Sequence, residues 1–170
     1  MKTLAAFAVL AALACVPARA QKLNINFDAI SKKATDKTEM SLEGPMLDML
    51  KQTVLKNVGK DNQAIFAGVD QISLHTYEFA KAGDYSDQDL DALRKQVTGS
   101  TGWSRMLNVQ EKDEATEIYT FMQGKNPAGF LLIAAEAKEL TVIHVSGTFQ
   151  LAQLQELIKS TVQFKELAQQ

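Results

Sequence analysis

The spacing of hydrophobic residues predicts two clear amphipathic helices. Between Pro45 and Val58 apolar residues recur every three or four positions, and Gly59 provides a stop signal. A later helix is predicted after Ser86, because Ser86 and Asp89 have the spacing of a capping box. The apolar positions of the two helices are Met46, Leu47, Met49, Leu50, Val54 and Leu55, and then Leu90, Leu93 and Val97.

Shorter patterns predict the remaining elements of the N-terminal half. Asn26 is placed to cap a short helix carrying Phe27, Ile30 and Ala34, and a brief strand follows at Met40 and Leu42. Asp61 is placed to cap another short turn, which carries Ile65 and Phe66. Residues 69–79 alternate as a long strand, with Ile72, Leu74 and Thr76 on one face and Ser73, His75, Tyr77 and Phe79 on the other.

From Trp103 onward the period is two. Four runs alternate, at residues 103–110, 116–122, 129–135 and 140–146, and the connections between them are short and rich in turn-forming residues. Connections of this length make neighbouring strands antiparallel. After Gly147, a closing helix is predicted from Leu151, Leu154, Leu157, Ile158 and Val162. The prediction is an α+β fold: a single domain whose antiparallel sheet includes a C-terminal four-strand meander, with helices packed on it.

The first twenty residues have the pattern of a secretory signal peptide. Lys2 precedes an apolar stretch over residues 4–13, and Ala18-Arg19-Ala20 provides small residues for cleavage. The mature domain would then span residues 21–170, in the periplasm or outside the cell. Alternatively, Cys15 is acylated and anchors a lipoprotein, although Ala12 stands where such signals usually have leucine.

Loss of this leader changes both the charge and the available chemistry. The net charge falls from −2 to about −4, which argues against nucleic acid as a partner. Cys15 is the single cysteine, so the mature chain would have no disulfide and no thiolate. No later segment is long and apolar enough to span a membrane.

The sequence contains no recognisable catalytic, cofactor-binding or metal-binding set. His75 and His144 are interpreted as hydrogen-bonded, partly buried strand residues; the alternative is a pH sensor or a base, and a metal site would need both together with a carboxylate. The acidic run at Asp84, Asp87, Asp89 and Asp91 lacks the glycine and glutamate of a calcium loop, so Asp87 and Asp89 are assigned to the first turn of a helix. No glycine motif for phosphate binding is present.

One group of residues is a candidate binding surface. Trp103 opens a strand, Arg105 lies on the same face two residues later, and Met106 follows. The alternative is that Trp103 belongs to the core.

The segments Trp103-Ser-Arg-Met-Leu-Asn-Val-Gln110, Glu117-Ile-Tyr119 and Glu139-Leu-Thr-Val-Ile-His-Val-Ser-Gly147 resemble the DUF4252 family. Its members are exported bacterial proteins of unassigned function, many of which have lipoprotein signals. The resemblance covers most of the mature chain and implies the location and the fold. It implies no catalytic residue.

These observations predict a non-enzymatic binding or interaction domain of the cell envelope, which requires no cofactor. It would bind another envelope protein or a small ligand through a sheet face or an edge strand. One alternative is a periplasmic, hydrolase-like enzyme whose site is assembled from distant histidines and carboxylates. Another is a component of envelope signalling or stress response.

Overall fold

The computed structural model describes residues 23–55, 63 and 66–149. Its elements, in chain order, are α1 (Asp28–Ser31), β1 (Asp36–Glu43), α2 (Gly44–Leu55), β2 (Val69–Glu78), α4 (Asp87–Thr98), β3 (Trp103–Glu111), β4 (Glu114–Gln123), β5 (Asn126–Ala135) and β6 (Glu139–Gly147). Among these residues, no helix is long and apolar enough to cross a membrane.

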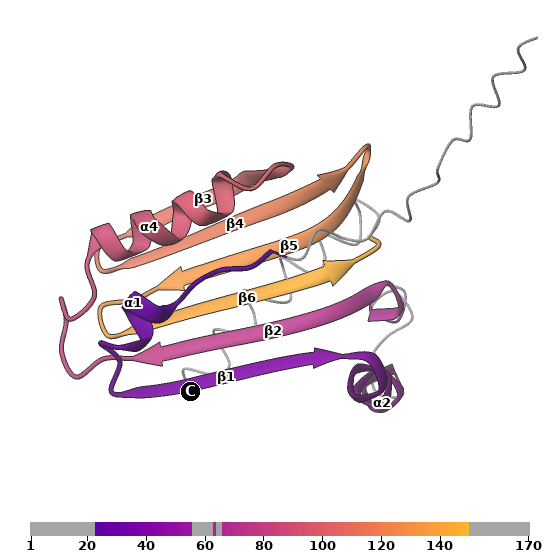
Figure 1. The fold of residues 1–170 in the computed structure, drawn as a ribbon, viewed down its shortest axis with the longest axis horizontal. Coiled ribbons are helices and arrows are strands. Elements are labelled where there is room, and N and C mark those ends of the chain that lie inside the picture. Colours follow the sequence, from indigo (N-terminus) through magenta and orange to yellow (C-terminus); the bar gives the residue numbers. More distant parts are fainter. Residues whose placement is uncertain (1–22, 56–62, 64–65, 150–170) are drawn as a thin grey trace, which may run out of the picture.

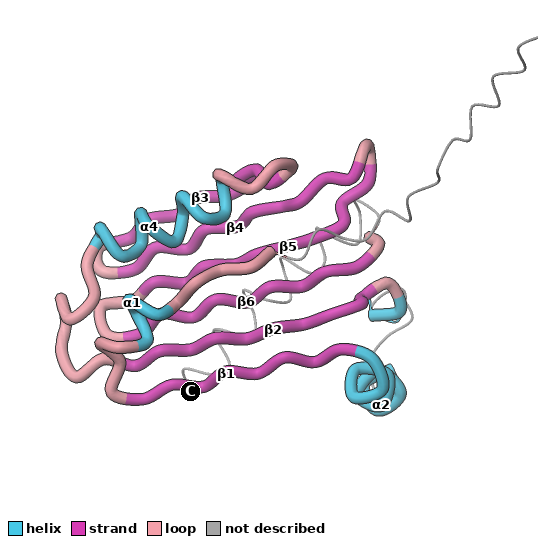
Figure 2. Tube along the Cα trace, in the orientation of Figure 1, coloured by secondary structure: helices cyan, strands magenta, loops and turns pink. Residues whose placement is uncertain are grey.

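The six strands form one antiparallel sheet in the order β1-β2-β6-β5-β4-β3 (Figures 1 and 2). The predicted meander is therefore confirmed as β3 to β6. On the side away from β5, β6 pairs with β2, and β1 follows β2 at the edge of the sheet. The α+β prediction is confirmed as well. Within the described residues, β1 and β3 are the two edges of the sheet.

The meander strands extend further into their connections than the sequence predicts. Glu111 pairs with Glu114, and Gln123 pairs with Asn126, so each of these turns contains only two residues. Pro127 lies inside β5 instead of in a loop. It is tolerated there because the register shifts between Phe121 and Met122, and Pro127 is opposite Met122 at this irregularity.

One face of the sheet, which we call the α4 face, is covered by α4 and by the segment 23–31 (Figure 1). Residues two apart on a strand point the same way, and this alternation sends one set of large side chains toward α4. The cluster includes Tyr77, Tyr119, Leu131, Ile133, Leu140 and Val142 from the strands, and Leu90, Leu93 and Val97 from α4. The predicted apolar stripe of α4 and the predicted faces of β2 are thus confirmed.

The opposite face carries a second apolar cluster. It includes Ile118, Phe130, Leu132, Val145 and Phe149, and α2 contributes Leu47. The predicted helix from Pro45 is confirmed as α2 up to Leu55. The remainder of that prediction, most of the turn after Asp61 and the closing helix after Gly147 lie outside the described residues.

The predicted start of α4 is confirmed, whereas α1 differs from its prediction. At α4, the Ser86 amide donates to the Asp89 carboxylate over 2.8 Å, as the capping box requires. At α1, Asn26 does accept a hydrogen bond from the Asp28 amide at 2.7 Å, but the helix begins two residues later and ends at Ser31. Ala34 is therefore outside it, contrary to the prediction.

Candidate functional site

A cavity of about 230 Å³ lies on the α4 face, between the sheet and the N-terminal segment 23–27. We call it the histidine cavity. Its walls come from that segment and from four strands, β1, β2, β5 and β6. The lining residues are Leu23, Asn24, Ile25, Phe27, Ser41, Gln71, Ser73, His75, Leu131, Val142 and His144.

Strand pairing brings the two histidines into this cavity. His75 on β2 is opposite Val142 on β6, and His144 is opposite Ser73. The two imidazoles are therefore diagonal neighbours on one face of adjacent antiparallel strands, close enough for their side chains to interact. They are 69 positions apart in the sequence, and β6, which pairs with β2, is the last strand of the meander along the chain.

His144 is almost completely buried, with 6% of its surface exposed. Its Nε2 atom has no hydrogen-bond partner among the described residues. Burial lowers the pKa of His144 to about 4, and the nearby His75 lowers it further in the same direction. At neutral pH the residue is therefore an uncharged imidazole with an unused polar atom.

His75 is half-buried and stacks on Phe27, with ring centroids 4.4 Å apart. Its buried Nδ1 atom has no hydrogen-bond partner. Burial lowers the pKa of His75, and the negative charge of Glu39 on β1 partly opposes this effect. The Glu39 carboxylate itself accepts a 2.8 Å hydrogen bond from the Tyr77 hydroxyl and does not line the cavity.

The interpretation of both histidines as hydrogen-bonded strand residues is therefore wrong for two ring nitrogens, Nδ1 of His75 and Nε2 of His144. Alternation correctly placed His144 on the face of Leu140 and Val142, but it could not show whether a neighbouring strand supplies a partner for each ring nitrogen. As for metals, no group of three or more His, Cys, Asp or Glu residues in the described chain is arranged to hold an ion. The two imidazoles are the only such side chains in the cavity lining.

The N-terminal wall of the cavity is attached to α4. The Asn26 amide donates to Gln96 Oε1 over 2.7 Å, and Gln96 Nε2 donates to the Asn26 carbonyl over 3.1 Å. One glutamine side chain thus satisfies both backbone groups of Asn26, as a neighbouring strand would. Leu23, Ile25 and Phe27 then pack against the core of the α4 face. No local sequence motif indicates this attachment.

The candidate surface at the start of β3 is divided by the fold. Trp103 is buried, with 7% of its surface exposed, and its ring reaches over Gly129 on β5. The Arg105 side chain is about half exposed and lies 3.6 Å from the Glu117 carboxylate. Met106 is exposed beside a register shift between Arg105 and Leu107. Trp103 therefore belongs to the core, whereas a binding role for Arg105 and Met106 stays a prediction.

A buried ionic network was missed by the sequence analysis. Glu117 on β4 is 1% exposed and accepts hydrogen bonds from Arg94 Nε at 2.6 Å and from the Tyr119 hydroxyl at 2.5 Å. Burial alone would raise the pKa of Glu117, but the hydrogen bonds from Arg94 and Tyr119 outweigh it and lower the pKa. Tyr119 responds in the opposite direction, with a pKa raised to about 12 by burial and by the carboxylate. The signal in the sequence was an acidic residue at an inward position of a strand.

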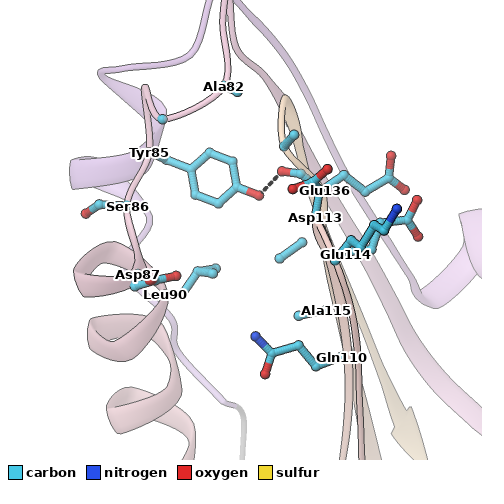
Figure 3. Close-up of a pocket in the computed structure, with 14 residues that line it drawn as sticks. Ala82, Tyr85, Ser86, Asp87, Leu90, Gln110, Asp113, Glu114, Ala115 and Glu136 are labelled. Carbon is cyan, nitrogen blue, oxygen red and sulfur yellow. Dashed lines mark hydrogen bonds between the residues drawn. The ribbon is translucent and has the colours of Figure 1, made fainter.

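A second cavity, of about 270 Å³, lies between the start of α4 and the β3–β4 and β5–β6 turns (Figure 3). We call it the Tyr85 cavity. Tyr85 projects across it and donates a hydrogen bond to the Glu136 carbonyl, as Figure 3 shows. Its lining includes four acidic residues, Asp87, Asp113, Glu114 and Glu136, together with Lys112. Asp87 and Asp89 are in the first turn of α4, which confirms their assignment.

Comparison with known proteins gives one result. The model of a family described as a domain of unknown function (DUF4252) matches residues 31–157. No curated protein and no solved structure matches the chain. The match begins after segment 23–27 and includes both cavity histidines.

Proposed function

Because the chain belongs to the DUF4252 family of unknown function, we propose its function from the site: a non-enzymatic domain that binds a small ligand in the histidine cavity. The observation that carries this proposal is the pair of buried, unpartnered nitrogens, Nδ1 of His75 and Nε2 of His144. Buried polar atoms without partners are uncommon because each one lowers stability. A ligand that hydrogen-bonds to them would recover this loss.

The enzymatic alternative has less support. Two histidines do share one cavity, as that alternative requires, but no carboxylate is among the described residues that line it. A general base works best when its pKa lies near the working pH. The pKa of His144, at about 4, makes it a weak base at neutral pH. These features favour binding over proton transfer.

The proposed place of action is outside the cytoplasm. The signal-peptide pattern over residues 1–20 supports export, and cleavage after Ala20 would start the mature chain at Gln21, two residues before the cavity wall at Leu23. Intact-mass analysis of the protein from its native cells tests this part. A chain beginning at Gln21 supports secretion, one beginning at an acylated Cys15 supports membrane anchoring, and an uncleaved chain contradicts export.

Ligand-observed NMR with a library of single-ring fragments tests the binding site. We expect fragments that bind the wild-type protein to lose affinity for His144→Phe, which keeps a ring but removes both nitrogens. Gln110→Ala, in the lining of the Tyr85 cavity, is the matched control and should change nothing. Fragments that bind wild type and His144→Phe equally would contradict the proposed site.

A further inference from the structure

We infer, building on the proposed function, that the ligand of the histidine cavity is a small uncharged molecule with an apolar ring or chain and at least one hydrogen-bonding group. The described lining of the histidine cavity carries no formal charge. Of the described residues that line the cavity, none is Asp, Glu, Lys or Arg. The titratable side chains there are His75 and His144, and both have lowered pKa values because they are buried.

A charged ligand would lose hydration on entering this cavity without gaining an opposite charge. Several charged side chains on the α4 face have partners outside the lining. Glu39 accepts from Tyr77 over 2.8 Å. Arg94 binds Glu117, which also lies near Arg105. None of these groups lines the cavity, although the negative charge of Glu39 reaches His75 from the neighbouring strand.

The two imidazoles in the cavity lining can form hydrogen bonds without carrying a charge. A neutral imidazole has one N–H donor and one acceptor nitrogen, and the tautomer decides which is which. Nδ1 of His75 and Nε2 of His144 can therefore each donate or accept without becoming charged. A ligand with an amide or hydroxyl group can complement either tautomer.

Part of the wall is apolar. Leu131 and Val142 contribute aliphatic surface from the sheet, and Phe27 stacks on His75 from the N-terminal segment. A cavity of about 230 Å³ is below the usual range for drug-sized ligands, so it suits a molecule of about one ring. The wall thus combines two imidazoles and the uncharged polar side chains of Asn24, Ser41, Gln71 and Ser73 with apolar surface.

Three single-ring probes of similar size test the inference on the full mature chain at pH 7: benzamide, benzoate and benzylammonium. Affinities would be measured by calorimetry, and the site by shifts of backbone amide signals in NMR spectra. We expect benzamide to shift residues around His75 and His144 and to bind at least about tenfold more tightly than either ion. His144→Phe should weaken benzamide binding, and His75→Gln provides a second variant if that one does not fold. Gln110→Ala should bind benzamide normally.

The outcomes separate this inference from the proposed function. If benzoate or benzylammonium binds in the histidine cavity as tightly as benzamide, the ligand class is wrong although the binding site stands. If Zn²⁺ shifts both histidines and binds more tightly than benzamide, the uncharged class is also wrong. If none of the probes binds there at millimolar concentration, both the inference and the proposed function fail.

Discussion

The ring of Trp103 lies 5.6 Å from the ring of His144, although β3 and β6 are separated in the sheet by β4 and β5. The indole passes Phe121 on β4, at 5.7 Å between ring centroids, and crosses β5 at Gly129. It thereby brings the edge strand into contact with His144, which lines the histidine cavity. Within the part of the chain that the structure describes, neither Trp103 Nε1 nor His144 Nε2 has a hydrogen-bond partner.

This crossing depends on the missing side chain of Gly129. A Cβ at that position would lie 3.1 Å from both Trp103 Cη2 and Phe121 Cβ. We expect Gly129→Ala to lower the free energy of unfolding by about 1–3 kcal/mol, because overpacking strains a filled core. Urea denaturation, followed by Trp103 fluorescence in this variant, measures the change.

A double-mutant cycle with Trp103→Leu identifies the cause. The smaller side chain leaves space above residue 129, so Gly129→Ala should cost much less in that background. Circular dichroism replaces fluorescence for the variants without Trp103. Equal costs in both backgrounds would mean that the indole is not what excludes a side chain at this position.

Acid should destabilise the protein through His144. Its folded-state pKa of about 4 lies below the unfolded value of 6.5, so the unfolded chain binds more protons between these limits. Stability therefore falls as the pH is lowered from 6.5 to about 4, by about 3 kcal/mol over the whole range. Urea titrations at several pH values measure this dependence.

His144→Phe should flatten the profile in the same window because it removes the titrating group. His75→Gln should have a smaller effect, since the half-buried His75 has a lowered pKa that Glu39 partly restores. An unchanged slope between pH 6.5 and 4 in His144→Phe would show that other groups cause the acid sensitivity.

The contribution of the Glu117 network to stability should be lost in a different pH range. The folded-state pKa of Glu117 is lowered, so its contribution is complete above the unfolded value of 4.5 and is lost as the pH falls through and below that value. Arg94→Met should cost about 3–5 kcal/mol at pH 7, because it leaves a buried carboxylate without its main partner. Differential scanning calorimetry at pH 7 and in acid measures both effects.

Arg94→Met combined with Glu117→Leu separates pairing from packing. The double variant should recover much of the loss, since no unpaired charge remains in the interior. A double variant as unstable as Arg94→Met would indicate that the arginine acts mainly by packing. Asp91→Asn is a surface control, because Asp91 bonds Arg94 at 2.8 Å but is more than half exposed.

The exposed part of β3 tests the predicted interaction surface. Met106, Leu107 and Val109 are exposed apolar residues on an edge strand, where unpaired backbone groups can accept another strand. We expect a photo-crosslinking residue at Met106 to capture a specific envelope protein in intact cells. The same residue at Met40, which is exposed on the other edge strand β1, is the control.

Val109→Lys should abolish that crosslink and change stability by no more than about 0.5 kcal/mol, as is usual for surface substitutions. The captured protein would then be purified and its binding to the wild type and Val109→Lys compared. Equal capture from Met40 and Met106 would argue against a dedicated surface on β3.

Local patterns were enough to predict the fold class, the meander and most element positions, because these follow from the spacing of apolar residues, helix caps and turn residues. Ser86 and Asp89, for example, are only three positions apart, and their capping box fixes the start of α4. The family was predicted from the resemblance of short segments, and the match over residues 31–157 confirms it. The sequence did not determine which distant side chains meet. His75 and His144 share a cavity because β6 pairs with β2. Trp103 contacts His144 across the meander, and Arg94 binds Glu117 because α4 packs on the same sheet face. Alternation assigns a residue to a face, but its neighbours and its unmet hydrogen bonds depend on strand order and register, which long-range packing decides.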